Sequence, residues 1–199
     1  DASEVRRLRE VAGILSGQLT DIEKIDSTCW ILFDNNDLAP FHSENYWFLL
    51  AHRKQFSQQV GQEKVDRRLG MLYTGVLSSI VWGRDTKTTF ADVQEIGKVI
   101  RTLKTDDKKR LLAYVSLANA YKEKNTSELL KISKKAFPVF SDADVMMMVM
   151  PVSVYFRTQE DKAALREFIP VGRTVVPNLK IQENVNYVTY YFDELEKQM

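Results

Sequence analysis

The sequence predicts an all-α fold in which antiparallel helical hairpins stack into an α–α superhelix. Apolar residues recur every three to four positions in almost every segment of the 199 residues, which places them on one face of successive helices. Glycine and proline are scarce, at 8 and 5 residues, so few tight turns are available for an all-β design. The one β-like stretch, residues 173–176, is too isolated to pair with another strand. Short links between amphipathic helices make neighbouring helices antiparallel.

Two helices and a loop are expected at the start of the chain. The first helix carries an apolar row at helical spacing: Val5, Leu8, Ala12, Leu15 and Leu19. Thr20 and Glu23 have the spacing of a capping box, which starts a second helix that ends at about residue 34. The polar run at 34–37, followed by Pro40, then predicts a loop.

Further helices follow, each with its own apolar stripe. Their approximate ranges are 44–60, 65–82, 90–103, 111–121, 129–140, 141–156, 164–169 and 185–195. Residues that favour helix starts precede several of them: Ser43, Thr88 or Thr89, Asn125, Ser141 and Asn184. Gly61 and Gly83 end two of them. Pro151 is expected to kink or break its helix, and the helix at 164–169 is expected to end before Pro170.

Charge and composition exclude several classes of protein. Lys plus Arg number 28 and Asp plus Glu 27, so the formal net charge of +1 lacks the basic footprint of a nucleic-acid-binding protein. The longest apolar run, residues 145–156, is shorter than the roughly 20 residues that span a bilayer, so no membrane span is expected. We predict one domain over residues 1–199. Because the chain begins at Asp1 rather than Met, the alternative that a signal peptide or an upstream domain has been removed stays open.

Few residues are suited to catalysis or metal binding. The single cysteine, Cys29, excludes a Cys-based redox pair or zinc site and fits a small core residue. The two histidines, His42 and His52, stand before and inside one predicted helix, which is a poor arrangement for a shared metal ion. The sequence contains no phosphate-binding glycine loop and no nucleophile elbow. We therefore predict that the protein is not an enzyme and that it needs no metal or cofactor.

Two apolar or aromatic clusters allow a structural and a binding interpretation. The methionine-rich run at 146–150 fits a buried helix that is apolar all round, although flexible thioethers also suit an adaptable recognition surface. Tyr187, Tyr190 and Tyr191 flank the last helix. Core packing is the favoured interpretation for these tyrosines, with an interface role as the alternative.

One segment carries a degenerate repeat motif. The motif combines small and aromatic residues, a polar turn and apolar residues that pack back, at the spacing of two closely crossing helices. Its residues are Ala118, Asn119, Ala120, Tyr121, Lys124, Asn125, Leu129, Leu130 and Ala136. The segment resembles the tetratricopeptide repeat, although Leu130 replaces the usual alanine and Ala136 falls one residue early. An irregular α bundle is the alternative. The resemblance implies a concave binding face, where Asn119 and Lys122 could hold a peptide carboxylate or backbone.

A second resemblance rests on residues 46–69. An aromatic-rich helix with a basic pair, Arg53 and Lys54, ends at Phe56, and the sequence Gly-Gln-Glu-Lys-Val-Asp follows at 61–66. This stretch is similar to the helical region after the thioredoxin domain in secreted thioredoxin-like proteins of anaerobic Gram-negative bacteria. The resemblance implies an all-helical, tetratricopeptide-like accessory region exported to the periplasm. It does not imply redox activity, because Cys29 lacks a second, resolving cysteine.

These features predict a non-catalytic protein-interaction or scaffolding domain with a protein or peptide partner. From the resemblance, the protein is expected to be periplasmic or secreted. The alternative is an accessory region of a divergent thioredoxin-like protein whose redox domain lies upstream or has been lost. Neither the partner nor the oligomeric state follows from the sequence.

Overall fold

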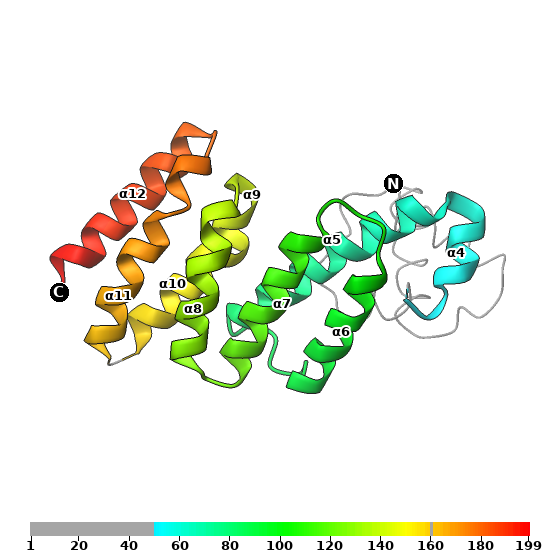
Figure 1. The fold of residues 1–199 in the computed structure, drawn as a ribbon, viewed down its shortest axis with the longest axis horizontal. Helices are drawn as coiled ribbons and strands as arrows, with labels where there is room; N and C mark the ends of the chain where they lie inside the picture. Colours follow the sequence, from blue (N-terminus) through cyan, green and yellow to red (C-terminus); the bar gives the residue numbers. More distant parts are fainter. Residues whose placement is uncertain (1–49, 160) are drawn as a thin grey trace, which may run out of the picture. The chain divides into compact units, whose positions relative to one another are not determined.

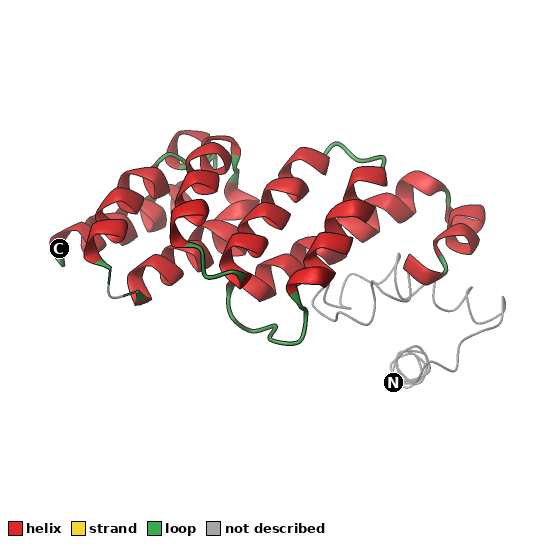
Figure 2. Cartoon of the chain, turned by 60° about the horizontal axis from the view of Figure 1, so that its bottom comes forward, coloured by secondary structure: helices red, strands yellow, loops and turns green. Residues whose placement is uncertain are grey.

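Every regular element in the described part of the chain is helical. The computed structural model describes residues 50–159 and 161–199, and these contain helices and no strand (Figure 1, Figure 2). The all-α prediction is therefore confirmed for these residues. The helices expected before residue 50 lie outside them, as do Cys29 and His42. The prediction of one domain over 1–199 stays a prediction.

The described residues form two compact units. Unit 1 holds residues 50–76 and 100–108, and unit 2 holds residues 77–99 and 109–199. Helix α5 (Gln62–Val81) and helix α6 (Phe90–Thr102) each contribute residues to both units.

Unit 1 contains α4 (Arg53–Val60) and most of α5. Gly61 ends α4 as predicted, because its φ of 88° lies in the left-handed region and its N–H donates to the carbonyl of Ser57. The apolar stripe that predicted α5 is buried in this unit: Val65, Leu69, Leu72 and Val76. The residues that the helical spacing placed on one face of this helix are therefore the residues that form the core of unit 1.

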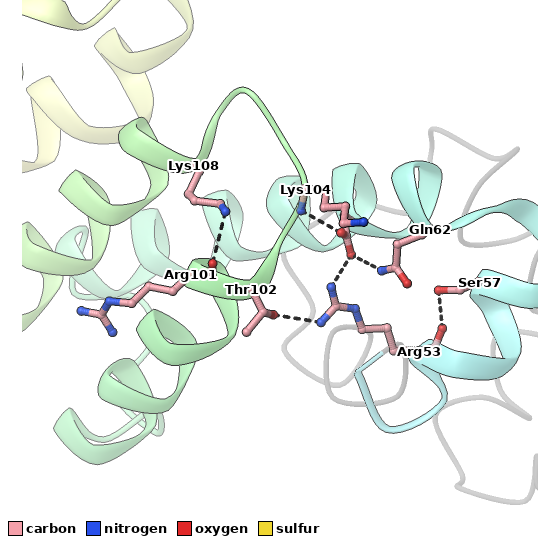
Figure 3. A network of polar contacts seen from close by, with 8 residues as sticks. Arg53, Ser57, Gln62, Arg101, Thr102, Lys104 and Lys108 are labelled. Carbon is pink, nitrogen blue, oxygen red and sulfur yellow. Dashed lines mark hydrogen bonds and ion pairs between the residues drawn. The ribbon is translucent and has the colours of Figure 1, made fainter.

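A buried carboxylate joins three segments of unit 1. Asp66 on α5 is fully buried, and its Oδ1 accepts hydrogen bonds from Arg53 Nη2 and Gln62 Nε2, both at 2.6 Å (Figure 3). Its Oδ2 accepts from the backbone N–H of Lys104 at 2.8 Å. Arg53 also donates to the hydroxyl of Thr102 at 3.0 Å. A buried charge is stable only when it has an ion-pair partner and hydrogen bonds, and Asp66 obtains both from these residues. The network therefore joins α4 and the turn after α6 to α5.

Unit 2 contains the remaining long helices. These are α7 (Lys108–Lys122, from its second residue), α8 (Thr126–Ala136), α10 (Met150–Thr158), α11 (Lys162–Arg173) and α12 (Gln182–Lys197). Shorter elements are the one-turn α9 (Asp142–Asp144), a π-helical stretch at Val145–Val149 and 3-10 turns at Phe137–Val139 and Val176–Asn178. Helix α11 packs against α8, α10 and α12. The core between them is aromatic, and Phe156 stacks on Phe168 with ring centroids 4.2 Å apart.

Several helices start at the residues that the sequence predicted. The N–H and hydroxyl of Thr89 donate to the carboxylate of Asp92, whose N–H donates back to the Thr89 hydroxyl at the start of α6. The side chain of Asn125 accepts a backbone N–H in the first turn of α8. Ser141 forms a capping box with Asp144 and starts α9.

Two predicted helix boundaries are wrong. Asn184 does not cap α12, which begins after Ile181. Asn184 lies in its first turn and donates to Asp142 Oδ1 at 2.9 Å. Helix α11 does not end before Pro170 but continues to Arg173. Buried side chains on both sides of Pro170 hold it there, since the burial of Phe168, Ile169 and Val171 outweighs the hydrogen bond that proline cannot make.

Pro151 changes the type of helix rather than ending it. The π-helical stretch before it ends at Val149, and α10 then begins at Met150 and carries Pro151 in its first turn, where a missing N–H costs little. In the methionine-rich run, Met148 and Met150 are buried, whereas Met146 is 52% exposed. The burial prediction is therefore confirmed for only part of the run.

The tyrosines of α12 are less buried than predicted. Tyr187 is 45% exposed and Tyr190 is 66% exposed, so the core prediction is wrong for both. Tyr191 is half-buried, and its ring meets Phe192 edge to face. The core face of α12 is formed by Val188, Phe192 and Leu195.

Candidate binding cavity

Unit 2 contains a cavity of about 590 Å³. Its walls come from the end of α5, the end of α7, the start of α8, and α10. Three aromatic side chains line it, namely Trp82, Tyr121 and Tyr155, together with the aliphatic residues Val81, Pro151 and Val154. We call it the aromatic cavity.

The three aromatic side chains are held in place by contacts of their own. The indole N–H of Trp82 donates to the carbonyl of Met146 at 3.1 Å, in the π-helical stretch. The rings of Tyr121 and Tyr155 meet edge to face with centroids 5.5 Å apart. The hydroxyls of Tyr155 and Thr126 are hydrogen-bonded at 3.0 Å. The aromatic wall is therefore largely formed before any ligand binds.

Lys122 connects the cavity to the loop between α5 and α6. Its Nζ donates to the carbonyl of Asp85 at 3.3 Å. The Asp85 carboxylate accepts from the N–H of Lys87 and from the N–H and hydroxyl of Thr88. Burial acts to raise the pKa of Asp85, but these hydrogen bonds and the charge of Lys122 together lower it below its ordinary value. Lys122 is therefore already engaged with this loop, through a hydrogen bond to its backbone and through the charge of its ionised carboxylate.

Lys124 is the second cation of the lining, and its backbone is unusual. Its φ of 53° is the one positive φ at a non-glycine residue in the described ranges 50–159 and 161–199. Its side chain is exposed and forms no ion pair with the part of the chain that the structure describes. Lys124 thus brings an unpaired positive charge to the cavity.

The lining offers aromatic faces, cations and neutral hydrogen-bonding groups. The neutral polar residues are Thr126, Thr158 and Gln159. Within residues 50–159 and 161–199, no Asp, Glu, His, Cys or Ser lines the cavity. The cavity is therefore suited to a ligand that combines apolar surface with negative charge or hydrogen-bond acceptors.

The two residues predicted to bind a peptide are placed differently. Lys122 lines the aromatic cavity. Asn119, one turn earlier on α7, is half-buried and is not part of the lining. Its Oδ1 is buried and has no hydrogen-bond partner among residues 50–159 and 161–199.

Sequence reasoning missed Trp82, Lys124 and Tyr155 as lining residues. Tyr121 belongs to the degenerate repeat motif of the sequence, and it lies in the wall of the cavity. Trp82 and Tyr155 are far apart in the chain, and no local spacing connects them. Lys124 offered a signal, since it lies in the link between the predicted helices at 111–121 and 129–140, where glycine is usual.

Other candidate groups contribute little in the described residues. His52 lies at the N-terminal end of α4. Over residues 50–159 and 161–199, no three His, Cys, Asp or Glu side chains are grouped to bind a metal ion. None of the helices in the same ranges has the length and apolar character needed to cross a bilayer.

The comparisons with known proteins add no relative. No protein-family model matches the chain, and neither a curated protein nor a solved structure is significantly similar to it.

Proposed function

We propose that the chain is a non-catalytic protein-interaction domain and that a segment of a partner protein binds in the aromatic cavity. The observation that carries this proposal is the preformed wall of Trp82, Tyr121 and Tyr155 beside two lysines. Aromatic side chains at fixed positions provide large contact areas at little cost in conformational entropy. A volume of about 590 Å³ is enough for several side chains of an extended segment.

The helices around the cavity support a tetratricopeptide-like interpretation of this segment. Ala118 and Ala120 on α7 are buried, and Leu129 on α8 is buried after a link of three residues. Small buried residues on one helix permit a close neighbour, which is the physical basis of that repeat. We therefore propose a helical-hairpin scaffold that presents the ends of α7 and α10 to the partner.

The test is a blocking substitution at the rim of the cavity. Thr158 lines the cavity and is exposed, so Thr158→Trp should fill the space without disturbing the core. Peptides selected from a random phage-displayed library on the wild-type chain should lose binding to Thr158→Trp. Lys134→Trp is the matched control, because Lys134 is exposed on α8 and does not line the cavity. Failure to select any peptide, or equal binding to both variants, would contradict the proposal.

Asn119 and Lys122 need separate variants. Lys122→Ala should weaken peptide binding, because Lys122 lines the cavity. Asn119→Ala tests whether the unpartnered Oδ1 contributes to binding through a rearrangement of α7. If the double variant Asn119→Ala with Lys122→Ala binds the selected peptides as tightly as the wild type does, neither residue holds the peptide.

The second candidate is an accessory region of a divergent thioredoxin-like protein. It rests on the resemblance of residues 46–69, within which Arg53 and Asp66 form an ion pair in unit 1. Export to the periplasm rests on the same resemblance. A gene sequence that encodes a βαβ pattern with a Cys-x-x-Cys motif before residue 1 would favour this candidate, and a signal peptide alone would favour the first.

A further inference from the structure

The end of α7 has the geometry of a Schellman motif, with lysine at the position that favours glycine. The N–H of Lys124 donates to the carbonyl of Tyr121 at 3.0 Å, and the N–H of Asn125 donates to the carbonyl of Ala120 at 2.9 Å. In this motif the residue that donates the first of these two bonds must adopt a left-handed conformation. That conformation is strained for any residue with a Cβ. Lys124 adopts it, with φ of 53°.

The end of α5 shows the usual solution in the same chain. The N–H of Gly83 donates to the carbonyl of Ile80, and the N–H of Arg84 donates to the carbonyl of Ser79, both at 2.9 Å. The left-handed residue there is Gly83, with φ of 70°. Both helices end beside the aromatic cavity, but only α7 has a strained residue at the corresponding position, and that residue lines the cavity. Strain that persists at a binding site indicates a role for the side chain.

The charges of the lining point to the chemistry of that role. The Nζ of Lys122 already donates to the backbone carbonyl of Asp85, and its charge helps to lower the pKa of that carboxyl, whereas the side chain of Lys124 has neither a hydrogen bond nor an ion pair in the described residues. No carboxylate from the described part of the chain lines the cavity. We propose that the cavity selects a partner segment with an acidic side chain beside an apolar one, and that Lys124 recognises the carboxylate. This inference rests on the proposed function.

The aromatic wall accounts for the apolar half of that motif. The rings of Trp82, Tyr121 and Tyr155 accept an aliphatic or aromatic side chain while the carboxylate meets Nζ of Lys124 at the exposed rim. The rim is exposed at Lys124, Thr158 and Gln159, so an extended segment can cross the cavity without ending in it. The carboxylate is therefore assigned to an internal Asp or Glu rather than to a chain end.

The test uses matched pools of labelled nonapeptides with both ends blocked. Their flanking positions vary among Leu, Ile, Phe and Tyr, and the central residue is Glu, Gln or Lys. The wild type should bind the Glu pool about fivefold more tightly than the Gln pool at low salt, and least tightly the Lys pool. In Lys124→Gly this preference should disappear while the midpoint of thermal unfolding rises, because glycine relieves the left-handed strain.

The opposite responses of binding and stability distinguish recognition from a structural role. If Lys124 only complements the C-terminal end of the α7 dipole, Lys124→Gly should leave the preference for Glu unchanged, which overturns the inference. Equal binding of all pools to the wild type overturns it too, while the proposed function stands if Thr158→Trp abolishes that binding. A Gln pool with a free C-terminus that binds as tightly as the blocked Glu pool would assign the carboxylate to a chain end. Binding of no pool contradicts both proposals.

Discussion

The guanidinium of Arg53 on α4 donates from Nη2 to Oδ1 of Asp66 on α5 across 2.6 Å. Asp66 is fully buried, while the Arg53 side chain keeps 24% of its surface exposed. The side chain of Arg53 therefore lies partly at the surface while its guanidinium pairs with a buried carboxylate. The ion pair therefore gives Arg53, the first residue of the basic pair at 53–54, a structural role in unit 1.

Asp66→Asn should destabilise unit 1 strongly. The substitution removes the charge that pairs with Arg53 and turns one acceptor oxygen of the network into a donor. We expect the free energy of unfolding to fall by about 2–4 kcal/mol, which urea denaturation followed by circular dichroism will measure. Glu63→Gln is the control, because its pair with Arg67 is exposed and should change stability by less than about 0.5 kcal/mol. Equal small effects of both substitutions would show that the network does not stabilise the fold.

Tyr114→Phe should remove a buried hydrogen bond in unit 2. The hydroxyl of Tyr114 donates to Asp144 Oδ1 at 2.7 Å, and the same oxygen accepts from Arg110 at 3.1 Å. Burial and the charge of Asp144 raise the pKa of Tyr114, so the hydroxyl stays protonated and remains a donor. We expect a loss of about 1–3 kcal/mol in the free energy of unfolding. Tyr190→Phe, at an exposed position, should have no measurable effect.

Gly172→Ala should disturb the contact between α11 and α12. A Cβ at position 172 would lie 2.0 Å from Cζ of Phe192, a distance that real side chains do not tolerate. We expect a loss of about 2–3 kcal/mol in stability, measured as a lower urea midpoint. The double variant Gly172→Ala with Phe192→Leu should lose less than the sum of the two single losses, since leucine leaves room for the methyl group. Additive losses would place the effect elsewhere.

Acid should lower the free energy of unfolding, because three carboxylates have lowered pKa values in the folded protein. The pKa of Asp142 is lowered by hydrogen bonds from Asn184 and Lys180, and that of Asp92 by hydrogen bonds from Thr89. For Asp85, the hydrogen bonds from Thr88 outweigh its burial with the help of Lys87 and Lys122. Because the folded pKa lies below the ordinary value of 3.8, the stabilisation is complete well above that value. It is lost as the pH falls through the folded pKa values.

The pH dependence can be assigned with one variant. Urea midpoints measured between neutral pH and about pH 2 should fall below about pH 4 for the wild type. Asp142→Asn should show a shallower fall, because one of the titrating groups is missing. If the slopes of the two proteins coincide, Asp142 does not contribute to acid sensitivity.

Local sequence patterns predicted the helices and many of their ends. Apolar spacing identified the buried face of α5, and capping chemistry identified the starts of α6, α8 and α9 at Thr89, Asn125 and Ser141. These features depend on residues three or four positions apart, whose geometry a helix sets by itself. They could therefore be inferred without knowledge of the rest of the chain.

The failures have a common cause in long-range packing. Pro170 predicted a helix end, but the burial of Phe168 and Val171 carries α11 past it. Asn184 matched a capping residue, but it bonds to Asp142, which is distant in the chain. In both cases a contact between segments outweighs a local preference.

The aromatic cavity belongs to the tertiary structure alone. Trp82, Tyr121 and Tyr155 come from three different helix ends or segments, and the spacing between them in the chain carries no sign that they meet. Periodicity decided which faces are apolar, since each turn of helix repeats the same geometry. Which apolar faces pack together, and where space remains between them, depends on side-chain shapes brought together across the fold.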